Sequence, residues 1–66
     1  MKVEIIKEVP FKESTMKLTG IKEECEKKLN LLRRDFGEDN VIVVFSHDYS
    51  NISLNRYECL VNVKID

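Results

Sequence analysis

The sequence is short of the residues on which several kinds of site depend. Its 66 residues include no tryptophan, one proline, two glycines, two cysteines and one histidine. With only Gly20 and Gly37, it has no glycine-rich loop to hold phosphate. Cys25 and Cys59 form no Cys-x-x-Cys pair and His47 is alone, which excludes the usual structural zinc site. We therefore expect neither a metal nor a cofactor.

Long hydrophobic runs are also missing. The longest, residues 41–45, is far shorter than the roughly 20 residues that span a bilayer. The opening segment MKVEIIKEV places acidic residues among its apolar ones, which is not typical of a signal peptide. Together with the low cysteine content, these features predict a cytoplasmic protein with reduced thiols and no contact with a membrane.

Charge of neither sign dominates, since 11 basic residues face 12 acidic ones and the net charge is −1. This balance excludes the global positive field that holds a long nucleic acid. The length predicts a single domain over residues 1–66. A domain of this size buries only about 60% of its surface on folding. Below roughly 70–80 residues, a disulfide, a metal or an oligomeric partner usually adds stability.

Apolar periodicity predicts one helix and at least three strands. From 18 to 36 the apolar residues are spaced by three and four, as in an amphipathic helix; they are Leu18, Ile21, Cys25, Leu29, Leu32 and Phe36. Thr19 would be its N-cap and Gly37 its end. Residues 2–9 and 56–65 alternate between apolar and polar, which predicts strands. The consecutive apolar residues in 40–48 predict a strand buried on both faces.

Residues 11–19 leave two alternatives open. Met16 and Leu18 alternate with polar residues as in a short strand, whereas Ser14 or Thr15 would cap an earlier helix start. The predicted fold class is therefore α+β, with the order βαββ, or ββαββ if 14–19 form a strand, and with the helix on one face of the sheet. Strands 2–9 and 40–48 would run parallel if they share this sheet. The last two strands would form an antiparallel hairpin.

A single helix covers only one face of such a sheet. We expect that face to carry Val3, Ile5, Val41, Val43, Phe45, Cys59, Val61 and Val63. The opposite face would carry four more aliphatic side chains, Ile6, Ile42, Val44 and Leu60. Burying each of these gains about 1.5–3 kcal/mol, so we interpret the four as the contact face of a homo-oligomer. Cys25 and Cys59 both point into the core, where two reduced thiols are favoured over a disulfide.

Aromatic and basic residues gather around the turn 48–55 and the end of the helix. Such residues are typical of a site that stacks a base and holds a phosphate, and the candidates are Phe45, Tyr49, Arg56, Tyr57, Arg33 and Arg34. Hydrogen bonds would come from Ser46, Ser50, Asn51, Ser53 and Asn55. The alternative interpretation is a core phenylalanine, a hairpin tyrosine pair and solvated arginines.

The run Ser46-His47-Asp48 contains the residue types of a catalytic triad. Triad residues are rarely adjacent in sequence, and alternation places His47 and Asp48 on opposite faces of a strand. The sequence also has no Gly-x-Ser-x-Gly nucleophile motif. We therefore expect no enzymatic activity and assign no catalytic residue.

The order of elements resembles that of the dodecins, small flavin-binding proteins with β–α–β–β order. The resemblance rests on the opening MKVEIIKEV, the long helix, and the spacing of Tyr57, Val61 and Val63. The family's flavin-stacking tryptophan has no counterpart, and Glu58 stands where the family has glutamine, so no flavin site is carried over. The small size and the abundance of lysine, glutamate and asparagine also resemble phage-encoded proteins, many of which block a host protein or sequester a nucleotide.

These observations leave two hypotheses for the function. The first is a homo-oligomer that sequesters a small anionic ligand, such as a nucleotide, at its subunit boundaries. The second is an inhibitor or adaptor that binds a host protein through Ile6, Ile42, Val44 and Leu60.

Overall fold

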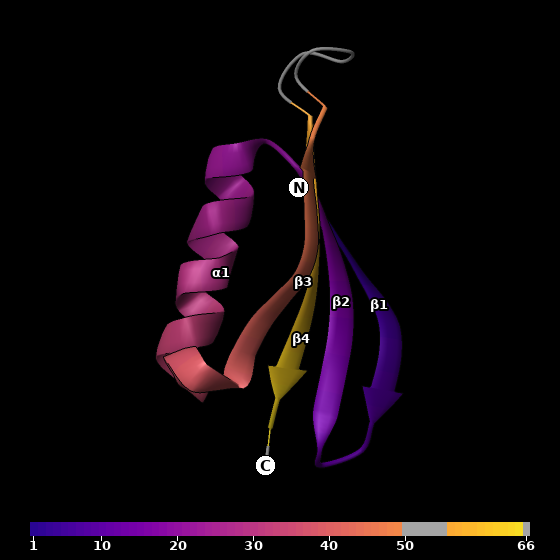
Figure 1. Cartoon of the computed structure of the whole chain (residues 1–66), viewed down its shortest axis with the longest axis vertical. Helices are drawn as coiled ribbons and strands as arrows, with labels where there is room; N and C mark the ends of the chain where they lie inside the picture. Colours follow the sequence, from indigo (N-terminus) through magenta and orange to yellow (C-terminus); the bar gives the residue numbers. More distant parts are fainter. Residues whose placement is uncertain (50–55, 66) are drawn as a thin grey trace.

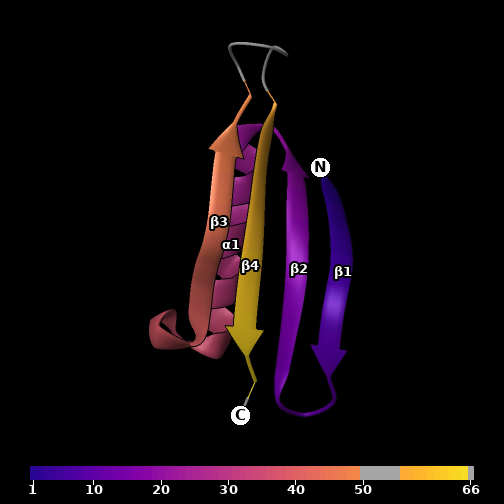
Figure 2. The same ribbon diagram turned by 45° about the vertical axis from the view of Figure 1, so that its right-hand side comes forward.

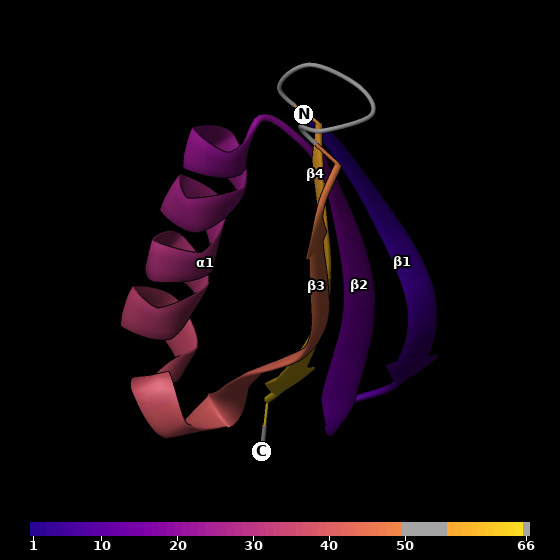
Figure 3. The ribbon, with the colours of Figure 1, turned by 45° about the horizontal axis from the view of Figure 1, so that its top comes forward.

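The computed structural model describes residues 1–49 and 56–65, and its elements follow the order ββαββ (Figure 1). The elements are β1 (Lys2–Val9), β2 (Glu13–Gly20), α1 (Lys22–Phe36), the 3-10 helix η1 (Glu38–Asn40), β3 (Val41–Asp48) and β4 (Tyr57–Lys64). The strands form one antiparallel sheet in the spatial order β1-β2-β4-β3 (Figure 2). Helix α1 forms a second layer on one face of this sheet (Figure 3). The chain therefore has the predicted α+β fold.

Strand β2 resolves the alternative that residues 11–19 left open. Met16 and Leu18 lie in this strand and face the core, as the alternation indicated. Thr19 also lies in β2, so its prediction as the helix N-cap is wrong. The N-cap is Ile21, which makes no capping hydrogen bond through its side chain. Leu18, the first residue of the apolar pattern that predicted the helix, therefore belongs to β2, and it faces the same core as the apolar side of α1.

Helix α1 ends where the sequence predicted. Gly37 adopts a φ of 95°, and its N–H donates to the Arg33 carbonyl oxygen at 2.9 Å. Glycine reaches this backbone region without the steric penalty that a Cβ atom imposes. The acidic residues of the first turn and Arg33 and Arg34 of the last turn also match the helix dipole. The helix boundary at this end is therefore encoded locally.

The core lies between α1 and the strands β2, β4 and β3. Nine of the residues that the structure describes are buried in this core; they come from all four elements and are Met16, Leu18, Cys25, Leu29, Leu32, Val41, Cys59, Val61 and Val63. Leu18, Cys25, Cys59 and Val61 are completely buried. Because β4 is central in the sheet and faces α1, its alternating residues contribute three members of this core, as many as α1 does.

The apolar run of β3 predicted a strand buried on both faces, and this prediction is wrong. It is an edge strand covered on one side only, and Ile42, Val44 and Phe45 are 45%, 59% and 50% exposed. Its pairing with β4 shifts register between Val43 and Phe45, which marks a β-bulge at Val44. Phe45 consequently lies opposite Leu60, on the face away from α1, and not in the core where simple alternation placed it.

Strand β1 lies at the other edge of the sheet, beyond β2 as seen from α1 (Figure 2). Val3 and Ile5 pair with Leu18 and Met16 but stay 44% and 52% exposed, so their predicted burial under the helix is wrong. The predicted parallel relation between β1 and β3 is also wrong, since these strands run in opposite directions. The reason is that β1 and β2 form an antiparallel hairpin, and the crossover through α1 connects β2 with β3. Strand β3 therefore has the direction of β2, which is opposite to that of β1.

The sheet face that points away from α1 is called the open face below. Its centre is polar: Lys17 Nζ lies 3.0 Å from Glu58 Oε1, and Asn62 Nδ2 donates to Thr15 Oγ1 at 2.9 Å. The hydrogen bond and the negative charge of Glu58 raise the pKa of Lys17. Apolar and aromatic side chains occur on this face mainly along β3.

Candidate functional site

The structure divides the six predicted ligand residues between the two faces of the sheet. The groups are Arg33 with Tyr57 on the helix side, and Phe45 with Tyr49 and Arg56 on the open face; Arg34 is exposed on the helix and joins neither. Of the five turn residues proposed as hydrogen-bonding groups, Ser46 lies on the helix side. The other four lie outside the described residues.

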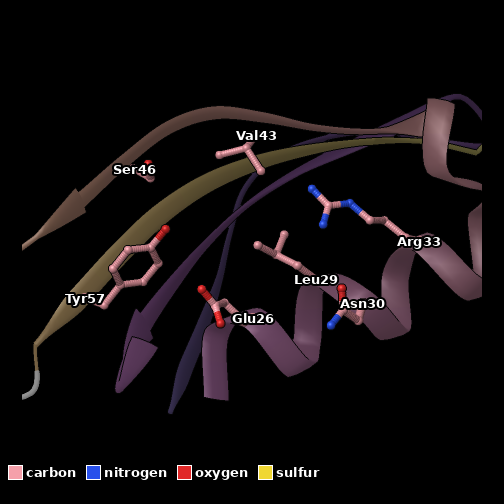
Figure 4. Close-up of a pocket in the computed structure, with 7 residues that line it drawn as sticks. All are labelled: Glu26, Leu29, Asn30, Arg33, Val43, Ser46 and Tyr57. Carbon is pink, nitrogen blue, oxygen red and sulfur yellow. The ribbon is translucent and has the colours of Figure 1, made fainter. Parts of the chain in front are cut away.

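A cleft of about 430 Å³ opens between α1 and the strands β3 and β4 (Figure 4). It is lined by Glu26, Leu29, Asn30, Arg33, Val43, Ser46 and Tyr57. The four helix residues follow i, i+3, i+4, i+7 spacing and therefore share one face of α1. The bulge in β3 turns Ser46 toward the helix, so a hydroxyl replaces the apolar wall that strict alternation would build. The cleft volume lies within the range of small-molecule sites.

Two opposite charges face this cleft at different ends. Glu26 and Arg33 are seven residues apart, which corresponds to about 10 Å along a helix. Figure 4 shows the Arg33 side chain extending from α1 toward Val43, and the Glu26 carboxylate lying on the side of Tyr57. Within residues 1–49 and 56–65, neither charged side chain makes a hydrogen bond or an ion pair. Both remain available to a ligand.

The second group forms a row of rings along β3 on the open face. The Phe45 and His47 rings are parallel within 4°, with centroids 6.4 Å apart, and His47 and Tyr49 have centroids 4.3 Å apart. The Arg56 guanidinium lies 5.5 Å from the Tyr49 ring centroid, a cation–π geometry. The Tyr49 N–H also donates to the Arg56 carbonyl oxygen at 2.8 Å. These four side chains are called the aromatic row below.

The four residues predicted as an oligomer face do not form one patch. Ile42 and Leu60 are on the open face at neighbouring strands β3 and β4. Val44 occupies the bulge of β3, and Ile6 occupies a corresponding register shift in β1 at the opposite edge of the sheet. The polar residues of β2 lie between the two edges. The apolar surface is therefore concentrated along β3 and its neighbour β4.

Cys25 and Cys59 are free, completely buried thiols of the core. Burial raises the pKa of Cys59 to about 11, with smaller contributions from Cys25 and Glu58, and burial also raises the pKa of Cys25. A thiol is nucleophilic as its thiolate, so these shifts and the burial make both residues unreactive. They act as core side chains.

The described residues contain no group of three or more His, Cys, Asp or Glu side chains placed to hold a metal ion. In the same residues, no helix is long and apolar enough to cross a bilayer. The two candidate ligand-binding sites are the cleft and the aromatic row.

The chain matches no protein family, no curated protein and no solved structure. The resemblance to the dodecins therefore rests on element order, and that order differs here. The N-terminal strand is part of a hairpin, which makes the chain ββαββ where the resemblance implied β–α–β–β.

Sequence reasoning missed Glu26, Asn30 and His47 as candidate site residues. Glu26 and Asn30 share the i, i+4, i+7 series with Arg33, which is a readable signal once the opposite wall of the cleft is known. His47 alternates with Phe45 and Tyr49 and was considered only as a catalytic group. The bulge at Val44, which places Phe45 in the same row, has no signal in the sequence.

Proposed function

We propose that this protein is a small, non-catalytic, homo-oligomeric binding protein that holds an anionic, nucleotide-type ligand in the cleft between α1 and β3–β4. The observation that supports this most is the half-buried Arg33, which faces the cleft without an ion-pair partner among the described residues. An arginine in this position offers a planar fork of donors that matches a phosphate group.

The other walls of the cleft suit the remainder of a nucleotide. The ring of Tyr57 offers a flat surface for a base, and Leu29 and Val43 supply apolar contact beside it. Asn30 and Ser46 supply hydrogen-bonding groups for a sugar or a base edge. A mostly polar site with one cation favours a ligand of low charge, such as a monophosphate.

The proposed oligomer uses strand β3, which borders the cleft and is an edge strand of the sheet. Two of its half-exposed apolar residues, Ile42 and Val44, would be covered if a second copy packed there. The β1 edge carries four charged residues among its apolar ones, Lys2, Glu4, Lys7 and Glu8. A second copy at β3 would lie beside the mouth of the cleft, which places the ligand near a subunit boundary.

Native mass spectrometry followed by thermal-shift measurements with a panel of nucleotides and flavins tests this proposal. We expect a species heavier than the 7.8 kDa chain and a nucleotide-dependent rise in melting temperature. Arg33→Ala should remove that rise. Arg34→Ala is the matched control, because Arg34 is exposed and outside the cleft, and it should leave the rise unchanged. Equal shifts in both variants contradict the assignment of the site.

A second candidate function is favoured by the position of β3 at the edge of the sheet. An inhibitor or adaptor would bind a host protein there, by adding a strand to the sheet and covering Ile42, Val44 and Phe45. A strictly monomeric chain of 7.8 kDa that shifts with no nucleotide would favour this function over the first.

A further inference from the structure

The aromatic row is separate from the proposed nucleotide cleft. The row lies on the open face, whereas the cleft lies on the helix side of the sheet. Phe45 is 50% exposed, and His47 is also exposed. Phe45, His47 and Tyr49 occupy every second position at the end of β3; the Phe45 and His47 rings are parallel within 4°, and the Tyr49 ring is tilted by 57° against His47. Neither the core nor the cleft uses these rings.

Charge on the open face differs from charge on the chain as a whole. Five cations lie on this face or beside it at the end of the row, against three carboxylates: Lys2, Lys7, Lys17, Lys64 and Arg56 against Glu4, Glu13 and Glu58. The complete chain has a net charge of −1, so the rest of the chain is acidic. The sheet face with the rings is therefore also the face with the positive balance.

We propose that the open face binds a short, single-stranded segment of nucleic acid. About three bases would stack on the rings of Phe45, His47 and Tyr49, since every base has a face that stacks on an aromatic ring. Arg56, held beside Tyr49, would contact a phosphate at the end of the row. Hydroxyl and amide groups of β2 and β4, such as those of Thr15 and Asn62, would lie beside the bound nucleic acid.

The charge of the whole chain sets the length and strength of this interaction. A long nucleic acid needs many phosphate contacts, which a chain of net charge −1 does not provide. Binding would depend mainly on stacking, with few counterions released. We expect dissociation constants near the micromolar range at low salt, and a weak dependence on salt concentration.

Fluorescence anisotropy with a labelled oligothymidylate of about ten nucleotides tests the proposal. Phe45→Ala should weaken binding about tenfold or more, because it removes one stacking surface. Arg56→Ala should weaken binding and reduce the salt slope by about one. Two controls match these changes: Phe11→Ala removes an aromatic ring that is 88% exposed and lies in the β1–β2 turn, and Arg34→Ala removes an arginine from the helix. Both should bind as the unaltered chain does.

The outcomes separate this inference from the proposed nucleotide site. Arg33→Ala should leave oligothymidylate binding unchanged, since the cleft lies on the helix side. A circular dichroism melt for each variant shows that it is folded. Absence of binding at low salt overturns the inference, as does equal affinity of folded Phe45→Ala and the unaltered chain. A dimer that Phe45→Ala dissociates, without oligothymidylate binding, also overturns it and assigns the row to self-association.

Discussion

The burial of Cys59 leads to a quantitative prediction for the ionisation of its thiol in alkaline solution. Burial raises its pKa from 9.0 to about 11. At about pH 8, a thiol with the lower value is about 9% ionised, and one with the higher value about 0.1%. The folded chain should therefore present about 100-fold less Cys59 thiolate than the unfolded chain. Because the side chain is also completely buried, reaction with a thiol reagent should require opening of the fold.

The same shift makes the stability of the fold depend on pH. The folded state holds the Cys59 proton more tightly than the unfolded state does, so the stability from this group is complete below about pH 9. It is lost as the pH rises through 9 toward 11. The two-unit shift corresponds to at most about 2.7 kcal/mol in the free energy of unfolding. In a domain of this size, that loss should lower the urea midpoint clearly.

Two measurements test this reasoning. Labelling with a chromogenic disulfide reagent at about pH 8 should be slow for the folded chain and fast in guanidinium chloride. Urea unfolding between about pH 8 and 11 should show the loss of stability, and Cys59→Ala should reduce that pH dependence despite its lower starting stability. Labelling of the folded chain at the rate of the unfolded one would refute the argument. A pH dependence unchanged in Cys59→Ala would refute the assignment to this thiol.

Three further changes have defined expected outcomes. Leu18→Ala removes a completely buried side chain of β2, and should lower the free energy of unfolding in urea by about 2–5 kcal/mol; a loss below about 1 kcal/mol would contradict its core position. Gly37→Ala places a Cβ atom at a φ of 95° and 3.3 Å from Asn40 Nδ2, and should cost about 1–3 kcal/mol in the same assay. In the proposed nucleotide site, the Glu26 carboxylate accepts two N–H donors best, so guanine nucleotides should bind better than adenine ones. Glu26→Gln should reduce that preference about tenfold in calorimetry, and an unchanged ratio would exclude contact with the base.

Periodicity predicted the elements well where it was unambiguous. The stripe of Cys25, Leu29 and Leu32 and the stop at Gly37 were confirmed, because a helix encodes its buried face and its end in nearby residues. The alternation in the last strand was confirmed too, with Cys59 and Val61 buried. The predicted start of the helix was wrong, because Leu18, an inward-facing residue of β2, fitted the helical spacing by coincidence.

The candidate site was predicted less well than the fold. The sequence identified six residues as one ligand group. The structure places Arg33 and Tyr57 on the helix side of the sheet and Phe45, Tyr49 and Arg56 on the open face, with Arg34 in neither group. Strand alternation assigns side chains to faces only while the register is continuous, and a single bulge reverses the assignment. Glu26 lines the cleft because β3 and β4 lie opposite its face of the helix, and helix periodicity alone does not predict which strands lie there.

By itself, the sequence determined the fold class, the helix, the hairpin of β3 and β4, and the burial of both cysteines. These features depend on the spacing of apolar residues, a local property of the chain. The tertiary structure decided which strands form the edges, where the bulges fall and which polar groups share a cleft. Strand order depends on pairings between residues far apart in sequence, and apolar periodicity carries no information about those pairings.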